Sequence, residues 1–133
     1  MNREQLRQFI AAGRVGYLAT ASAAGAPNCA IIGSATMVDD NHLLMGLGDS
    51  RTLDNLRHNN RAVFTVAEAG DNITRWQGAR LYVQVAEIVT DGALKEQVCA
   101  AVASAVGSAA AAAIAAAVRF EITDIRPLLA FAR

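Results

Sequence analysis

Aromatic side chains are scarce in this chain of 133 residues, since only 5% of its positions are Phe, Trp or Tyr. Proteins that bind single-stranded nucleic acid stack bases on aromatic side chains, so this scarcity argues against that class. An excess of positive charge is lacking as well, because twelve Lys and Arg balance twelve Asp and Glu. A neutral chain without a basic block is not expected to have nucleic acid as its main partner.

Cysteine is rare too, with only Cys29 and Cys99, which lie far apart in the sequence. Because there is no CxxC pair and the only histidines are His42 and His58, no four-ligand cluster for zinc is expected. Two free, buried thiols in a reducing compartment are expected instead. The N-terminus also lacks the apolar core of a signal peptide, and the sequence therefore predicts a cytoplasmic protein.

A long, strongly apolar run is also missing. The most apolar stretch, residues 98–118, is dominated by alanine and contains Ser104, Gly107 and Ser108. Alanine is only weakly hydrophobic, so this stretch is a poor candidate for a membrane span. The chain length predicts one domain over residues 1–133, which is large enough to bury a core without disulfides or metals.

The first third of the chain predicts one helix and three strands. Asn2 followed by Gln5 has the pattern of a capping box, and Gly13 is expected to end the helix that follows. Apolar patterning predicts strands over residues 14–21, 28–38 and 42–48, with turns at 22–27 and 39–41. Gly33 and Ser34 stand in the middle of the second strand, where glycine often marks a bulge or a close backbone approach.

The rest of the chain predicts three further strands and two or three helices. A short helix is expected from Thr52 to Asn59, and a longer one, capped by Asp91, carries apolar residues at four-residue spacing up to Val106. The alanine-rich segment up to Ala117 is expected to continue as another short helix. The strands are expected over residues 61–68, 79–90 and 118–123.

This order of elements predicts a mainly β fold. Consecutive strands joined by tight turns imply antiparallel pairing. A six-stranded sheet with few helices to cover it tends to close into a barrel, because closure removes the exposed edges. We therefore expect a six-stranded antiparallel barrel with flanking helices.

The most informative motif is Asp49-Ser50-Arg51-Thr52, which stands between an apolar strand and the start of a helix. A helix start has free N–H groups and a partial positive charge, so it can bind an anion. The Arg51 guanidinium suits phosphate, and the hydroxyls of Ser50 and Thr52 add donors. A capped surface helix with one solvated arginine explains the same residues equally well.

The element order and this motif together resemble the FMN-binding split-barrel family, the pyridoxamine 5′-phosphate oxidase-like proteins, and most of all its small single-domain members. The resemblance rests on the opening helix, the strand over residues 15–20, the Gly25-Ala26-Pro27 turn, the Ser50-Arg51-Thr52 motif and the passage over residues 55–63. It implies a split β-barrel that binds FMN. It also implies a homodimer with the flavin at the subunit interface.

The resemblance assigns parts of the cofactor to segments of this chain. The Ser50-Arg51-Thr52 triplet would hold the flavin phosphate, with Thr52 standing where the family commonly has lysine. The strand beside the isoalloxazine ring has no basic residue between Pro27 and Val38, a second departure from many relatives. The loop with Trp76 would reach over the flavin of the partner subunit, or else pack on its own barrel. The implied cofactor-binding residues are Ile31, Ile32, Gly33, Ser34, Met45, Gly46, Ser50, Arg51, Thr52 and Trp76.

Two classes of function follow. The first is an FMN flavoprotein, an oxidoreductase or electron carrier. Its substrate or redox partner is unknown, since no acid, base or nucleophile in the sequence indicates one. The second is a split-barrel protein that binds deazaflavin or haem, or a non-catalytic dimeric sensor or scaffold. The chain ends at Phe131-Ala132-Arg133 without the arginine-rich tail of the true oxidases. Pyridoxamine phosphate oxidase activity itself is therefore not expected.

Overall fold

The computed structural model describes residues 1–129. The expectation about an arginine-rich tail concerned residues 131–133. These residues lie outside the described part of the chain. The helices are α1 (Arg3–Ala11), α2 (Arg51–His58), the 3-10 helix η1 (Ile73–Arg75), α3 (Ala93–Val106) and α4 (Ser108–Ala112). The strands are β1 (Gly16–Ala21), β2 (Pro27–Ile32), β3 (Thr36–Met37), β4 (His42–Gly48), β5 (Arg61–Glu68), β6 (Gln77–Val89) and β7 (Ile114–Pro127).

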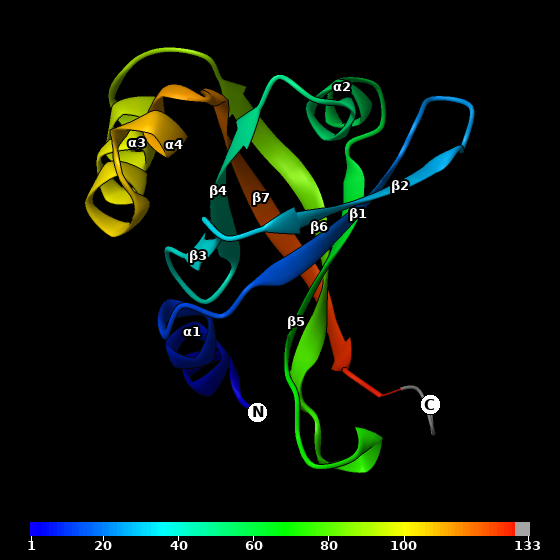
Figure 1. Ribbon diagram of the computed structural model, residues 1–133. Coiled ribbons are helices and arrows are strands. Elements are labelled where there is room, and N and C mark those ends of the chain that lie inside the picture. The colour runs from blue at the N-terminus through cyan, green and yellow to red at the C-terminus, as the bar shows by residue number, and fades with distance from the viewer. Residues whose placement is uncertain (130–133) are drawn as a thin grey trace.

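All strands belong to one curled sheet with the order β2-β1-β5-β6-β7-β4-β3 (Figure 1). The predicted mainly β, antiparallel fold is confirmed, but the described sheet has seven strands rather than six. The strand expected over residues 28–38 is divided, because β2 pairs with β1 at one edge and β3 pairs with β4 at the other. The three residues Gly33-Ser34-Ala35, called the linker below, therefore join the two edges of the sheet.

The inner face of the sheet forms the main core. Along β1, Leu18 and Thr20 are buried while Tyr17 and Ala19 are exposed, as the predicted alternation requires. Phe64 from β5 and the equally buried Phe120 from β7 are among the largest core side chains. This packing fixes which residues of each strand face the core and which face outward.

Helix α1 begins as the sequence predicts and contributes to this core. The Asn2 side chain accepts a hydrogen bond from the Gln5 backbone N–H at 2.8 Å, and the Gln5 side chain accepts one from the Asn2 N–H at 2.9 Å. This reciprocal pair is a capping box. Leu6 and Ile10 then pack into the main core.

The alanine-rich segment behaves differently from the prediction. Helix α4 ends at Ala112 and β7 begins at Ile114, whereas a helix up to Ala117 was expected. Ala116 and Ala117 are fully buried and pair with Leu47 and Gly46 of β4. Strand pairing and burial therefore override the helical propensity of alanine in this segment.

Helix α3 is attached to the outside of the sheet by a second, smaller core. Leu44 of β4, Val98 of α3 and Ala117 of β7 form that cluster, with Leu94 and Val102 packed against it. Of the predicted apolar stripe on α3, only Val98 is buried. The expected cap Asp91 is also wrong, because Gly92 is the N-cap and no side chain bonds the helix start.

Both cysteines are free, as expected, but the expectation that both are buried is wrong. Cys29 is exposed and Cys99 is half-buried. Cys29 lies on the outward side of β2, opposite the exposed Ala19 of β1. Among the helices of residues 1–129, none has the length and apolarity that crossing a bilayer requires.

The turn between β3 and β4 places Asp39 beside the ring of His42. The Nδ1 atom of His42 lies 3.0 Å from each carboxylate oxygen of Asp39, and the Asn41 N–H donates to Asp39 at 2.7 Å. The bond from Asn41, followed by that from His42, holds the pKa of Asp39 below its usual value of 3.8. A carboxylate with a lowered folded pKa adds stability above pH 3.8 and loses it as the pH falls through the folded value.

We therefore expect Asp39→Asn to reduce the loss of stability on acidification, since the variant has no carboxyl to protonate at this turn. Urea unfolding at about pH 6 and about pH 3 measures the effect. Asp71→Asn, in an exposed loop, is the control. If Asp39→Asn and the wild type lose the same stability between the two pH values, the turn does not stabilise the fold in this way.

Candidate functional site

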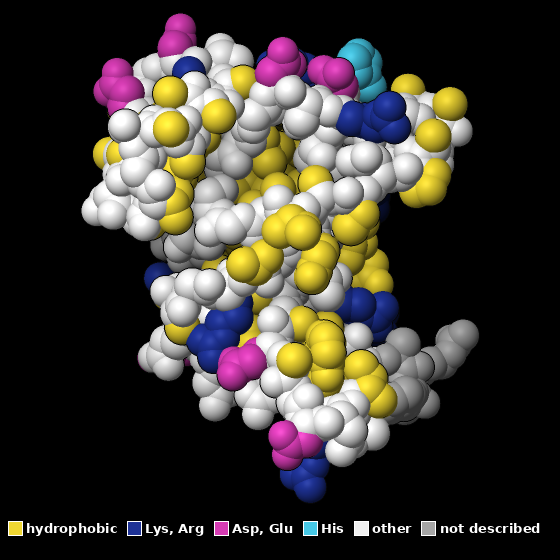
Figure 2. Space-filling view, viewed as in Figure 1, with side chains coloured by type: hydrophobic (Ala, Val, Ile, Leu, Met, Phe, Trp, Pro, Cys, Tyr) yellow, Lys and Arg dark blue, Asp and Glu magenta, His cyan; other side chains and the backbone are white. Residues whose placement is uncertain are grey.

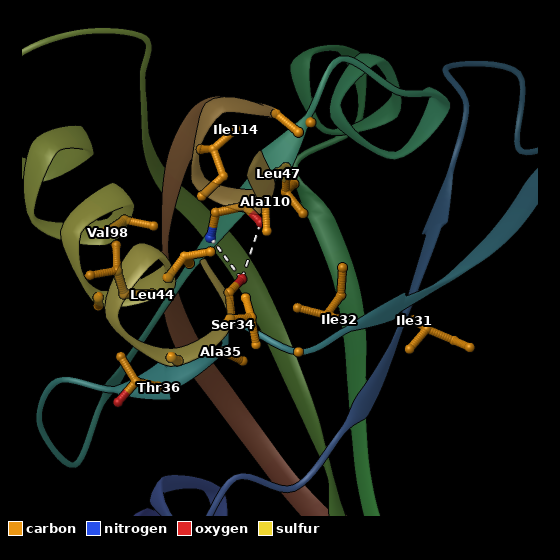
Figure 3. A pocket seen from close by; sticks show the side chains of 18 of the residues that line it. Ile31, Ile32, Ser34, Ala35, Thr36, Leu44, Leu47, Val98, Ala110 and Ile114 are labelled. Carbon is orange, nitrogen blue, oxygen red and sulfur yellow. Dashed lines mark hydrogen bonds between the residues drawn. The ribbon is translucent and has the colours of Figure 1, made fainter. Parts of the chain in front are cut away.

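A cavity of about 770 Å³ lies at the edge of the sheet beside the linker and β4, with lining residues from both cores. It opens between the linker, the edge of β4, the start of α2, and the helices α3 and α4 (Figure 3). In the space-filling view, hydrophobic side chains line a hollow beside α3 and α4 (Figure 2). This volume is in the range of about 300–1,000 Å³ that small-molecule sites occupy.

Ser34 shapes the floor of the cavity. Gly46 lies on β4 beyond the end of the short strand β3, so no strand pairs with its backbone on that side. The Ser34 hydroxyl donates to the Gly46 carbonyl at 3.1 Å and accepts from the Gly46 N–H at 3.1 Å (Figure 3). One hydroxyl can donate once and accept twice, so it satisfies both groups. The linker is thereby fixed against β4.

Gly46 also allows α3 to approach the sheet. A Cβ at this position would lie 2.8 Å from Cγ1 of Val98 and 2.9 Å from Cδ1 of Ile114. Those distances are shorter than ordinary carbon contacts, so a side chain here would push α3 or the start of β7 away. The glycine therefore sets the width of the cavity at its base.

The start of α2 forms the polar end of the cavity. Ser50 is the N-cap: its hydroxyl accepts from the Leu53 N–H at 3.3 Å and donates to the Gly48 carbonyl at 3.0 Å. The buried Thr52 accepts a hydrogen bond from the Asn28 side chain of β2 at 3.1 Å. Both hydroxyls thus hold the helix start in place, while the first N–H groups of the helix have no partner within it.

The structure brings together seven of the ten residues predicted to hold a cofactor. They come from the end of β2, the linker, β4 and the start of α2, and all line the cavity. Ile31 lies at the rim and is 69% exposed, whereas Ile32 is buried, because successive strand residues point to opposite sides (Figure 3). The seven are Ile31, Ile32, Gly33, Ser34, Gly46, Ser50 and Thr52.

The other three predicted residues lie elsewhere. Met45 is fully buried in the main core, since it faces the opposite side of β4 from Gly46. Arg51 is exposed and does not line the cavity, although both of its neighbours in the sequence do. Trp76, at the end of η1, is 39% exposed and lines a second hollow beside α1 and the end of β7.

Sequence reasoning missed the wall that α3 and α4 contribute. The four-residue spacing of apolar residues predicted the helix but not that its face lines a cavity. The available signal was Gly46, since a glycine inside a strand can mark the close approach of another segment. The missed lining residues are Gln97, Val98, Ala101, Val102, Ala105, Val106, Ala110 and Ala113.

Comparison with known proteins identifies relatives of the same fold. An FMN-binding protein from Syntrophomonas wolfei has a TM-score of 0.85 and 22% identity over 97% of this chain and 87% of its own. HutZ, the heme storage protein from Vibrio cholerae, has a TM-score of 0.72 and 17% identity over 96% and 95%. A FAD-binding protein from Mesorhizobium loti has a TM-score of 0.68 and 21% identity over 94% and 90%. At these identities the likeness is one of fold.

No curated protein sequence matches the chain significantly. A family model described as pyridoxamine 5′-phosphate oxidase, however, matches residues 3–130, which is almost the entire chain. This match agrees with the antiparallel sheet and flanking helices of the solved relatives. The chain belongs to the pyridoxamine 5′-phosphate oxidase-like family of split-barrel proteins.

Proposed function

We propose that this protein binds FMN in the cavity, along the linker, β4 and the start of α2, and acts as an oxidoreductase or electron carrier. The observation that supports the proposal is that seven residues predicted from the sequence to hold the flavin, from three separate stretches of the chain, line one cavity. When bound, the flavin would supply the electron-transfer chemistry. The protein's part is to bind and orient it and to keep solvent from its ring.

The walls of the cavity suit the two ends of this cofactor. Ile32, Ala35 and Leu47 offer apolar surface for the flavin ring. The free N–H groups at the start of α2, together with the neighbouring Arg51, suit the phosphate. Thr52 would contribute through its backbone N–H and its hydroxyl proton, since the hydroxyl only accepts from Asn28.

We propose in addition a homodimer with the flavin at its interface. Apolar side chains are exposed on the outer face of β1 and β2 and just before β1: Val15 is 48% exposed, Tyr17 47% and Ile31 69%. Tyr17 and Ile31 lie opposite each other in the register of the two strands. Because Ile31 also forms the rim of the cavity, a second copy on this face would cover the open side of the cavity. The location proposed is the cytoplasm.

A second candidate function has its own support. The hydroxyl of Ser50 both donates and accepts within the protein, and Arg51 does not line the cavity. These facts favour a ring ligand whose binding depends less on a phosphate, and one similar structure is that of a heme storage protein. The alternative is therefore a haem- or deazaflavin-binding member, or a dimeric sensor or scaffold without catalysis.

Arg51→Ala tests where the phosphate is held. We expect the affinity for FMN to fall about tenfold, because one charge-assisted hydrogen bond at a partly exposed site is lost. Arg57→Ala is the matched control, since Arg57 is an exposed arginine in the last turn of the same helix. Quenching of flavin fluorescence during titration gives both affinities.

Riboflavin, which has the same ring but no phosphate, sharpens this test. Arg51→Ala should leave riboflavin affinity unchanged if the arginine acts on the phosphate. If FMN binds Arg51→Ala and the wild type equally well, the phosphate is held elsewhere. If both ligands weaken equally, the substitution has disturbed the cavity rather than removed a phosphate contact.

A further inference from the structure

The cavity has one wall that the flavin residues do not use. Resting on the proposed FMN site, we infer that the wall formed by α3 and α4 receives a second molecule, one that is flat, apolar and uncharged. This molecule would be the substrate or redox partner of the flavin. The wall residues are Val98, Ala101, Val102, Ala105, Val106 and Ala110.

These residues form one continuous surface on α3. Val98, Val102 and Val106 repeat every four residues, and Ala101 and Ala105 repeat beside them, so that they share one side of the helix. The part of the stripe that packing leaves accessible, from Ala101 to Val106, extends about 7.5 Å along the helix axis, at about 1.5 Å per residue. It matches the length of a flat ring system rather than that of a single small group.

Most of this surface remains exposed, because other side chains of the protein do not cover it. Val98 is the one buried residue of α3, whereas Ala101 and Ala105 are exposed and Val106 is 71% exposed. Apolar surface that remains accessible inside a cavity gains free energy when an apolar ligand covers it. The hydrophobic effect therefore favours an occupant at this wall.

Apart from the exposed Gln97 at the beginning of the α3 wall, the polar side chains named here lie at the other walls. Ser34 is in the linker, while Ser50 and Thr52 are at the start of α2. This separation places the polar parts of a flavin at one end of the cavity and leaves the alanine and valine wall to an apolar molecule. A charged molecule against the valine and alanine stripe would lose its hydration and find no charged partner there.

Arg14, the one charged side chain among the described lining residues, is already engaged. Its guanidinium donates to the Glu68 carboxylate and to the Phe9 carbonyl, the latter at 3.4 Å. It also lies 4.4 Å from the centroid of the Phe9 ring. An anionic substrate such as pyridoxamine 5′-phosphate would have to displace Glu68 to use this cation, whereas a neutral molecule needs no counter-ion.

The test compares two probes that differ mainly in charge. The FMN-loaded protein is titrated by calorimetry with neutral 2-methyl-1,4-naphthoquinone and with anionic 1,4-naphthoquinone-2-sulfonate. We expect the neutral quinone to bind at least about tenfold more tightly, because only the anion is desolvated without a partner. Flavin fluorescence, followed in parallel, should show that FMN stays bound.

A pair of variants locates the binding surface. Ala101 lines the cavity and Ala100 does not, although both are exposed alanines on α3. We expect Ala101→Lys to weaken the neutral quinone and strengthen the sulfonate, and Ala100→Lys to change neither. Unfolding midpoints close to that of the wild type confirm that both variants are folded.

The outcomes separate this inference from the proposed function. A protein that takes up no FMN overturns the proposed function. A protein that takes up FMN but binds both probes equally, fails to bind the neutral quinone, or releases FMN when the quinone binds overturns the second-molecule inference alone. An Ala101→Lys variant with unchanged preference also overturns it.

Discussion

Replacing Gly78 by alanine is expected to destabilise the protein by about 3 kcal/mol or more. Gly78 lies in β6 opposite Ala67 of β5 and has φ +149°, in the region that side chains rarely adopt. A Cβ there would lie 2.0 Å from the carbonyl oxygen of Val66 and 2.9 Å from Cα of Ala67. The clash is with backbone, which cannot move aside as the end of a side chain can, so the β5–β6 hairpin itself must shift.

Urea unfolding measures this loss, and Gly25→Ala is the matched control. Gly25 also has a positive φ, +89°, but a Cβ there would meet no atom within 4 Å. The control therefore carries backbone strain alone and should cost about 1 kcal/mol. If Gly78→Ala costs no more than Gly25→Ala, the close approach of β5 to Gly78 is not present in the folded protein.

Gly16→Ala is the second large effect, and it acts in the main core. A Cβ at Gly16 would lie 2.2 Å from Cζ of Phe64, a ring that is fully buried. We expect a loss of about 2–3 kcal/mol, because the core is already filled and the ring must leave its position. Gly33→Ala is the control for stability, since a Cβ at that glycine would meet nothing within 4 Å.

The Phe64→Leu substitution tests whether the ring is the cause. Leucine lacks the Cζ atom that a Cβ at Gly16 would strike, so the double variant should be more stable than the sum of the two single losses predicts. We expect a favourable coupling of about 1 kcal/mol or more, because the two residues are in contact. Additive losses in urea unfolding would show that Gly16→Ala destabilises the fold through something other than Phe64.

Local patterns predicted much of the fold. The capping box at Asn2 and Gln5 was readable because both partners lie within one helical turn. The alternation of β1 was equally clear, since one of its faces is packed in the core and the other is exposed. Such features depend on neighbours in sequence, and the structure confirms them.

Features that depend on distant pairing were not predicted. Residues 28–38 form one apolar run, and nothing within it shows that β2 stops pairing where β1 begins, at Gly16 opposite Ile32. The same holds for Ala116 and Ala117, whose strand conformation depends on burial against β4. Cys29 was expected to be buried because free cysteine usually is, yet it occupies an outward position of an edge strand.

The candidate site likewise combines residues that a local motif predicts with residues that only a distant contact brings to the cavity. Ser50 and Thr52 were identified from a contiguous motif at a helix start, and both line the cavity. The α3 wall comes from a segment about fifty positions further along the chain. It reaches the cavity only because Gly46 lets Val98 approach β4. No spacing rule in one sequence encodes that contact.

A titration of the purified wild-type protein with FMN tests the central claim most directly. Our account predicts saturable quenching of flavin fluorescence at one FMN per chain, together with a changed visible spectrum as the ring enters an apolar cavity. Gly46→Val would displace α3 or the start of β7 at the base of the cavity and should lower the affinity, which ties the signal to this site. Unchanged flavin fluorescence and absorbance throughout the titration would contradict the claim that this protein binds FMN.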